Sequence, residues 1–202
     1  MFITFEGCEA SGKSTQAQRL KERLLGAGVS AIYTKEPGGT DLANKIRNIV
    51  LEEEIEDPMT EFLLISAARN DHVKYIKRCI LEGNIVISDR FSDSSIAYQG
   101  YCKNLDMDFI KEVNSRILHD VTPDITFLLD IDLQQIEARI ESSISHNNFY
   151  DNKSSDFHLK IKNAFLDIAK AHADRIFVID ANGTEEEVAE RIYNTCMNQG
   201  IV

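Results

Sequence analysis

A glycine-rich segment near the start of the chain, GCEASGKST, has the residue types and the spacing that hold phosphate groups. Its Gly-x-x-x-x-Gly-Lys-Ser pattern is that of a P-loop, and it lies between an apolar run and a helical pattern, where a P-loop is expected. Glycines let backbone N–H groups approach phosphate oxygens, and the start of the helix adds partial positive charge. Lys13 is expected to reach the β- and γ-phosphates of a nucleoside triphosphate, and the Ser14 hydroxyl to ligate Mg²⁺. The residues expected to bind the triphosphate are Gly7, Cys8, Glu9, Ala10, Ser11, Gly12, Lys13, Ser14 and Thr15.

A carboxylate, Glu9, stands in the middle of this segment. A negative charge directed at the triphosphate would repel it in a site with little solvent screening, so the side chain is expected to point out of the loop. There it would face a second substrate and could accept a hydrogen bond from a sugar hydroxyl. The alternative is an ordinary solvated acid on a loop.

Arginines occur where an acceptor phosphate would need them. Between residues 58 and 83 apolar residues recur at helical spacing, and Arg69 falls on the same stripe, so it forms either an internal salt bridge or a ligand contact. Asp89 and Arg90 end an apolar run, and ligands of open α/β sheets bind outside the carboxyl ends of strands. A site role is therefore favoured over a structural ion pair for these two residues. Arg47 lies in a plain amphipathic pattern and by itself would be read as solvated.

The elements that must position these residues are visible as short apolar runs separated by helix-length segments. Continuous apolar runs of this length suit strands buried on both faces of a parallel sheet. Their alternation with helical patterns indicates a doubly wound α/β fold. The runs are FITF (2–5), SAIYT (30–34), IVIS (85–88), ITFLLD (125–130) and RIFVID (175–180).

Helix boundaries are marked at three places. Asp57-Pro58 is expected to open a helix that runs to Gly83, and Asp106 to cap another. Thr184 and Glu187 are spaced as a capping box.

One segment, 142–156 (SSISHNNFYDNKSSD), has neither periodicity nor apolar content. It lies between two helical patterns and is expected to be a mobile polar flap. No composition shift separates two domains, so residues 1–202 are interpreted as a single domain.

The overall charge and composition exclude several classes of partner. A net charge of −11 argues against nucleic acid, because such binding needs dense lysine and arginine. No apolar run approaches the roughly 20 residues that span a bilayer, and the N-terminal MFITFEG lacks the features of a signal peptide. The cysteines are far apart, which favours reduced cytosolic thiols over a zinc site. They are Cys8, Cys79, Cys102 and Cys196.

Four segments together resemble a thymidylate kinase of the bacterial type. They occur in that family's order and spacing, and the pattern D-R-x-x-x-S-x-x-A-Y-Q separates the family from other nucleoside monophosphate kinases. The resemblance runs from residue 2 to about 140 and continues more weakly to the end. The segments are GCEASGKST (7–15), KEPGGT (35–40), AAR (67–69) and DRFSDSSIAYQG (89–100).

The resemblance implies a fold and an activity. The fold would be that of the P-loop kinases, a five-stranded parallel sheet flanked by helices, with a mobile lid. The activity would be the ATP-dependent phosphorylation of dTMP to dTDP, with Mg²⁺, in the synthesis of dTTP. A cytoplasmic homodimer would be expected, with neither nucleic acid nor a membrane as a partner.

The resemblance also implies roles for the residues at matching positions. Glu9 would hold the 3′-hydroxyl of the acceptor, which fits its outward orientation. Arg90 and Arg47 would bind the acceptor phosphate, and Asp89 would hold magnesium through water molecules. The implied catalytic residues are Lys13, Arg90, Asp89 and Arg139.

At the base, Arg69 would donate a hydrogen bond to the thymine carbonyl. Ser95 and Gln99 would read the base edge, while Tyr98 would lie under the sugar and disfavour a ribose 2′-hydroxyl. The implied acceptor-binding residues are Glu9, Arg47, Ile65, Arg69, Arg90, Ser94, Ser95, Tyr98 and Gln99.

The supply of cations departs from the family pattern. Members with an acid but no arginine in the P-loop usually provide arginines from the flap, whereas this flap offers only His146 and Lys153. A transition-state arginine can be worth about 10³ or more in rate. Arg139, just before the flap, is the preferred substitute, with Lys153 second, and a modest turnover is expected.

Two further positions also depart from the pattern. Ile65 stands where an aromatic ring normally stacks on thymine, unless Phe62 reaches the base. Lys35 stands where the family often has arginine, and a lysine lacks the bidentate fork of a guanidinium.

Other functions were weighed against this one. A phosphate monoester is mostly dianionic at neutral pH, so this nucleophile needs no general base. The absence of an obvious general base is therefore no objection to a kinase.

A non-catalytic nucleotide sensor is an alternative, motivated by the cation-poor flap. A regulatory GTPase would need an N-K-x-D segment, which the sequence lacks. A kinase for another pyrimidine monophosphate is the nearest alternative.

Overall fold

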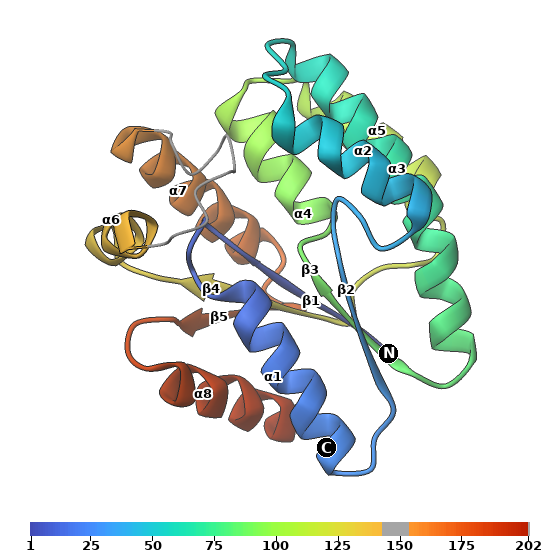
Figure 1. The fold of residues 1–202 in the computed structure, drawn as a ribbon, viewed down its shortest axis with the longest axis vertical. Helices are drawn as coiled ribbons and strands as arrows, with labels where there is room; N and C mark the ends of the chain where they lie inside the picture. Colours follow the sequence, from blue (N-terminus) through green and yellow to red (C-terminus); the bar gives the residue numbers. More distant parts are fainter. Residues whose placement is uncertain (143–153, 202) are drawn as a thin grey trace.

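The computed structural model describes residues 1–142 and 154–201, and its centre is a five-stranded parallel sheet (Figure 1). The strand order is β2-β3-β1-β4-β5. All five predicted apolar runs are strands, and their ends differ from the predicted ones by two residues at most. The strands are β1 (Phe2–Gly7), β2 (Ala31–Lys35), β3 (Ile85–Asp89), β4 (Ile125–Asp130) and β5 (Ile176–Asp180).

The central strand, β1, places the phosphate loop beside the ends of its neighbours. Phe5 of β1 lies opposite Asp89 of β3, and Gly7 lies opposite Leu129 of β4. The chain reaches β2 and β3 on one side of β1, then crosses to β4 and β5 on the other side. This reversal makes a crevice at the carboxyl end of the sheet, where open α/β sheets bind their ligands.

Helices cover both faces of the sheet, as the doubly wound prediction requires (Figure 1). Helices α1 and α8 pack together on one face, and α3 and α7 contact the other. Helix α2 packs on α3, α6 on α7, and α5 on α3, while α4 continues into a π-helical stretch, η1, that the sequence did not predict. The helices are α1 (Lys13–Gly26), α2 (Asp41–Glu52), α3 (Pro58–Leu81), α4 (Ser92–Ser95), η1 (Ile96–Cys102), α5 (Met107–Leu118), α6 (Leu133–Ser142), α7 (Ser155–Ala171) and α8 (Glu185–Asn198).

The predicted helix caps are confirmed. The Asp57 side chain accepts hydrogen bonds at the start of α3, and Asp106 accepts one from the backbone N–H of Phe109 at 2.7 Å. Thr184 and Glu187 form the reciprocal capping box of α8. These caps satisfy N–H groups that a helix start leaves without an intrahelical acceptor.

Both edges of the predicted flap differ from the prediction. Helix α6 ends at Ser142 and α7 begins at Ser155, so both edges of the 142–156 segment are helical. Residues 143–153, which include His146 and Lys153, lie outside the described residues. Within 1–142 and 154–201, no helix has the length and apolar character needed to cross a membrane.

Candidate active site

The phosphate-binding loop joins β1 to α1 through a tight turn. At Gly7 the backbone φ is 139°, and a Cβ there would lie 2.7 Å from the carbonyl oxygen of Leu129, so only glycine fits. Ala10 also has a positive φ, 54°, although it carries a side chain. No side chain caps the start of α1 at Gly12. The first N–H groups of this helix are therefore available to an anion.

Lys13 lies folded into this loop. Its Nζ donates to the carbonyl oxygen of Cys8 at 2.5 Å and to Oγ of Ser11 at 3.3 Å, and the side chain is buried. Burial, and then the positive charge of Arg90, lower the pKa of Lys13 to about 8. A bound polyphosphate would supply the negative charge that this ammonium group lacks.

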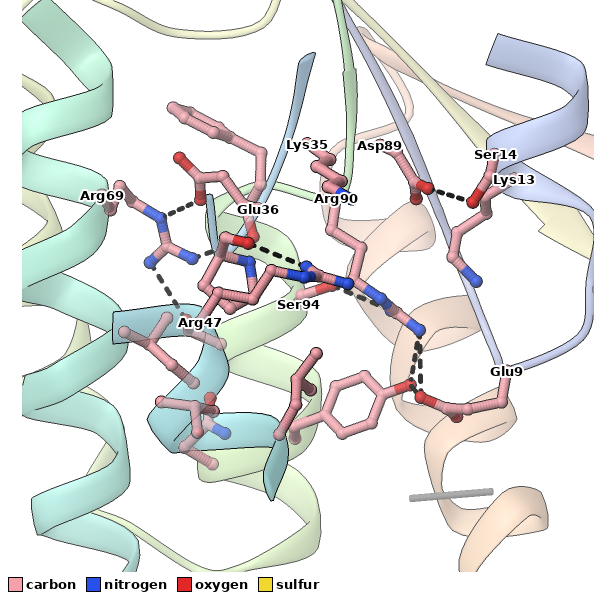
Figure 2. A pocket seen from close by; sticks show the side chains of 18 of the residues that line it. Glu9, Lys13, Ser14, Lys35, Glu36, Arg47, Arg69, Asp89, Arg90 and Ser94 are labelled. Atoms are coloured by element: carbon pink, nitrogen blue, oxygen red, sulfur yellow. Dashed lines mark hydrogen bonds and ion pairs between the residues drawn. The ribbon is translucent and has the colours of Figure 1, made fainter. Parts of the chain in front are cut away.

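Ser14 and Asp89 bring two oxygen ligands together beside the loop. The Ser14 hydroxyl donates to Oδ2 of Asp89, which ends β3 (Figure 2). Hydroxyl and carboxylate oxygens are hard ligands of the kind that Mg²⁺ prefers. The pair therefore fits the predicted magnesium site.

Two pockets meet at the loop and share Ala10, Lys13 and Ser14. The first pocket, shown in Figure 2, has a volume of about 400 Å³, and the second has about 810 Å³. Both volumes lie in the range of small-molecule sites. The first pocket is also lined by Asp89 and by all the predicted acceptor-binding residues, which are Glu9, Arg47, Ile65, Arg69, Arg90, Ser94, Ser95, Tyr98 and Gln99. The second is also lined by Ser11, Gly12, Thr15, Gln16, Arg139, Ala181, Gly183, Thr184, Glu185 and Val188.

Arg90 reaches across the mouth of the first pocket. It donates to the Gly7 carbonyl at 3.0 Å, to Ser94 Oγ at 3.1 Å, to Glu9 Oε1 at 3.0 Å and to the Tyr98 hydroxyl at 3.1 Å. Burial alone would lower the pKa of Arg90, but the neighbouring Tyr98 and Glu9 raise it overall. The guanidinium therefore stays charged, and Arg90 both forms an ion pair with Glu9 and lines the first pocket.

Arg47 is half-buried and lines the first pocket, so reading its helix alone as a solvated face was wrong for this residue. It donates to the Pro37 carbonyl at 2.8 Å. Burial lowers its pKa, and repulsion from Arg90 lowers it further. Two guanidinium groups that repel one another across a cavity make a strong site for a dianion.

Glu9 points out of the phosphate loop and into the first pocket, as its charge required (Figure 2). Its Oε1 accepts from the Tyr98 hydroxyl at 2.6 Å and from Arg90. The side chain is 5% exposed, and among the described residues its Oε2 has no hydrogen-bond partner. A buried, unpartnered acceptor oxygen in a pocket fits a ligand hydroxyl.

Arg69 forms the internal salt bridge that was one of the two alternatives for it, and it also borders the first pocket. Its Nε donates to Glu36 Oε2 at 2.6 Å in a fully buried salt bridge. Its terminal nitrogens donate to Ser95 Oγ at 3.0 Å, Asn114 Oδ1 at 3.3 Å and the Phe91 carbonyl at 3.2 Å. The residue also lines the first pocket, where it shares a crevice with Glu9.

Gln99 presents an acceptor at the deep end of the first pocket. Its Nε2 donates to Glu61 Oε2 at 2.9 Å, and its buried Oε1 has no partner within the described part of the chain. Ile65 lines the same pocket. Phe62 is fully buried against Phe109, with ring centroids 5.9 Å apart, and does not line it. Of these two side chains, only the aliphatic one of Ile65 borders the first pocket.

Arg139 is brought to the phosphate loop by α6. Its Nη1 donates to the Ala10 carbonyl at 3.1 Å, and the side chain lines the second pocket. The predicted alternative, Lys153, lies outside the described residues. Lys35 is exposed at the first pocket, so it can offer a charge without a bidentate contact.

Several residues of the site were not predicted. The second pocket is completed by the turn after β5, which the rule of strand ends would have found if it had been applied to the fifth strand. Glu6, a carboxylate inside an apolar run, was also overlooked. It accepts from Ser94 Oγ at 2.6 Å and from the Phe91 backbone N–H at 2.8 Å. Burial, followed by the nearby Asp93 carboxylate, raises the pKa of Glu6 to about 7.

Comparison with known proteins agrees with this geometry. The model of the family described as thymidylate kinase matches residues 5–192. The chain is 40% identical to a thymidylate kinase of Syntrophotalea carbinolica, over 98% of this chain and 95% of that protein, and 40% identical to one of Halothermothrix orenii, over 96% and 95%. The crystal structure of a thymidylate kinase from Ehrlichia chaffeensis superposes with a TM-score of 0.78 and 36% identity, covering 96% of this chain and 97% of that one. The chain belongs to the thymidylate kinase family.

Proposed function

We propose that this protein transfers the γ-phosphoryl group of ATP to the 5′-phosphate of dTMP, giving dTDP and ADP. The observation that carries the proposal is the meeting of two pockets at Lys13 and Ser14, with paired arginines in the first pocket and the open start of α1 at the phosphate loop. A donor in the second pocket and an acceptor in the first would place their phosphates against one another. Family membership identifies the nucleotides.

The chemical step needs alignment and charge neutralisation rather than proton removal. An oxygen of the dianionic acceptor phosphate attacks the γ-phosphorus, and the bond from that phosphorus to the β–γ bridging oxygen breaks, so ADP leaves. Arg47 and Arg90 hold the acceptor phosphate, while Lys13 is positioned to hold the transferring group. Lining up two bound reactants in this way can lower the barrier by about 7–11 kcal/mol.

Mg²⁺ would be held by Ser14 directly and by Asp89 through water, and it would supply positive charge that neutralises the phosphates. The hydrogen bond between these two side chains shows that they share one small region beside Lys13. Asp89 also fixes the Ser14 hydroxyl, which orients its oxygen for a ligand role.

The acceptor would be recognised by groups already placed in the first pocket. Oε2 of Glu9 would accept the 3′-hydroxyl proton, and the Tyr98 ring would lie under the sugar. Arg69 donates only, so it suits the carbonyl at position 4 of thymine. The amide nitrogen of Gln99 is engaged by Glu61, so this side chain offers only the acceptor Oε1 to a ligand. An acceptor here suits the N3–H of the same base.

The proposal is tested by a phosphoryl-acceptor panel. ADP release would be measured by a coupled assay with ATP, Mg²⁺ and each of dTMP, dUMP, dCMP, UMP and CMP, with Lys13→Ala as the inactive control. We expect dTMP to give the highest kcat/KM. Intact nucleotide binding with no ADP release would instead indicate a sensor, and preference for a cytosine nucleotide would indicate another pyrimidine kinase.

The family also suggests an assembly. We propose a cytoplasmic homodimer, and light scattering at micromolar concentration would test the dimer directly. A mass of one chain would contradict it.

A further inference from the structure

A row of four buried polar side chains, Thr34, His72, Glu36 and Arg69, runs from β2 to α3, and its last two members line the first pocket. Thr34 Oγ1 lies 2.6 Å from Nε2 of His72, Nδ1 of His72 lies 3.0 Å from Oε1 of Glu36, and Oε2 of Glu36 accepts from Nε of Arg69 at 2.6 Å. Their exposed fractions are 6%, 0%, 3% and 2% in this order. Glu36 belongs to the KEPGGT segment, to which the chemistry above gives no role beyond Lys35.

The protons in this row can be assigned from donor and acceptor chemistry. Burial would raise the pKa of Glu36, but the charge of Arg69 and the hydrogen bond from His72 lower it overall, so Glu36 is a carboxylate. A carboxylate can only accept, which places a proton on Nδ1 of His72. With this tautomer, Nε2 can accept a hydrogen bond from the Thr34 hydroxyl.

His72 is held tightly in this position. Gly39 adopts a φ of 88°, and a Cβ on this residue would overlap the imidazole ring of His72. The His72 ring is also stacked on the ring of Tyr75, with the centroids 6.2 Å apart and an angle of 14° between the planes. The second glycine of KEPGGT is therefore required for the ring to fit where it bonds Glu36.

The hydrogen bond from His72 determines how Glu36 binds Arg69. A carboxylate with both oxygens free tends to bind arginine in a bidentate fork, which uses Nε and a terminal nitrogen together. Here Oε1 is bonded to His72, and Glu36 contacts Arg69 through Oε2 and Nε. Both terminal nitrogens remain for Ser95, Asn114, the Phe91 carbonyl and the first pocket.

We propose that His72 is a positioning residue for acceptor choice: by occupying one oxygen of Glu36, it keeps the Arg69 guanidinium turned toward the position-4 carbonyl of the pyrimidine. This inference rests on the proposed function for the identity of the acceptor. Without His72, Glu36 rotates to engage a terminal nitrogen of Arg69, and the guanidinium turns away from the base.

Two substitutions at one position separate this role from a merely structural one. The amide nitrogen of an asparagine side chain can take about the position of Nδ1 of histidine. The amide nitrogen of glutamine, one carbon farther out, can take about the position of Nε2. His72→Asn therefore keeps the donor to Glu36, and His72→Gln loses it. Val73→Ala, at a buried position on the same helix outside the polar row, controls for lost stability.

Binding would be measured by calorimetry with dTMP and with 5-methyl-dCMP, which differ only at the N3 and C4 edge. We expect His72→Gln to weaken dTMP binding by about tenfold or more, with binding of 5-methyl-dCMP changed by less than about threefold. His72→Asn and Val73→Ala should both stay within about threefold of the unmodified protein for dTMP. KM for dTMP should rise in His72→Gln while kcat and KM for ATP stay nearly constant.

A crystal structure of His72→Gln tests the geometry independently of activity. We expect both oxygens of Glu36 on Arg69 and a lost bond to the Phe91 carbonyl; an unmoved Arg69, or equal weakening of both nucleotides, overturns the role of His72. If His72→Gln does not fold, Thr34→Val loosens the ring from its other end and should weaken dTMP alone by about threefold, whereas no selective loss overturns the proposal. An unmodified protein that does not phosphorylate dTMP would defeat the proposed function, while the crystal structure would still decide whether His72 holds Glu36.

Discussion

At the scale of single residues, Arg139 remains our proposed substitute for the arginine that the phosphate loop lacks. It comes from α6 and donates to the Ala10 carbonyl, which brings its guanidinium to the second pocket. A guanidinium on the transferring phosphoryl group can be worth about 10³ or more in rate. We expect Arg139→Ala to lower kcat by at least about tenfold, or about 1.4 kcal/mol, with a smaller change in KM for dTMP, in steady-state kinetics.

Two further variants make this result specific. Arg116→Ala removes an exposed guanidinium that pairs with Glu112 on α5, and it should leave kcat unchanged. Lys153→Ala tests the second candidate cation. If neither Arg139→Ala nor Lys153→Ala lowers kcat about tenfold, the compensation for the missing arginine is not made by these residues.

The depressed pKa of Lys13 predicts a pH dependence of ATP binding. Burial and Arg90 lower this pKa from 10.5 to about 8, and a bound triphosphate would raise it again by supplying negative charge. Below pH 8 the ammonium form is present before binding, so affinity should be level. Above pH 8 the free protein loses the proton that the complex retains, so affinity should fall by up to about tenfold per pH unit.

Calorimetry with a non-hydrolysable ATP analogue between pH 6.5 and 9.5 measures this slope. The arginine in Lys13→Arg stays charged across this pH range. The affinity of this variant for the ATP analogue should therefore not fall above pH 8. An equal decline in both proteins would assign the effect to another group.

At the scale of elements, the capping box of α8 both stabilises a helix and shapes the second pocket. Thr184 accepts from the Glu187 backbone N–H at 3.2 Å and lines the second pocket. Thr184→Ala should lower the free energy of unfolding by about 1 kcal/mol, and should also raise KM for ATP.

Asp106→Ala is the control. It removes the cap of α5, a helix that lines neither pocket, and it should lower the free energy of unfolding by about the same amount with KM for ATP unchanged. Urea unfolding and initial-rate kinetics on both variants measure the two effects, and parallel KM changes would mean that stability alone is responsible.

Most elements could be predicted from the sequence because their signals are local. Buried parallel strands carry continuous apolar runs, and Asp57, Asp106 and Thr184 mark helix starts by their own side-chain chemistry. The π-helical stretch Ile96–Cys102 had no such signal. It is packed against α7 and α5, so its geometry depends on contacts between elements that are distant in sequence.

At the scale of the whole molecule, the order of the strands in the sheet brings their carboxyl ends side by side. The predicted site residues lie together for this reason. The sequence could place Asp89 and Arg90 beside the phosphate loop by the rule of strand ends. It could not decide between the two roles of Arg69, because Glu36 lies 33 residues away and the pairing depends on how α3 packs beside β2. The burial of Arg47 was missed for the same reason, since a helix pattern does not reveal which cavity borders its polar face.

The whole molecule is also strongly acidic, which predicts how its stability responds to salt. Eleven uncompensated negative charges repel one another in the compact state. The distance over which exposed charges interact, the Debye length, falls from about 30 Å at 0.01 M salt to about 10 Å at 0.1 M. Surface ion pairs such as Arg19–Glu186 weaken with salt, but exposed pairs of this kind contribute little to stability, so net repulsion should prevail. We expect the unfolding midpoint to rise by a few degrees, or about 1 kcal/mol, between 10 and 150 mM NaCl in calorimetric scans. Changing the exposed Glu52, Glu53 and Glu54 to glutamine removes three of these charges and should reduce the rise. A midpoint that falls with salt would show instead that local ion pairs, rather than net charge, dominate the electrostatics of this fold.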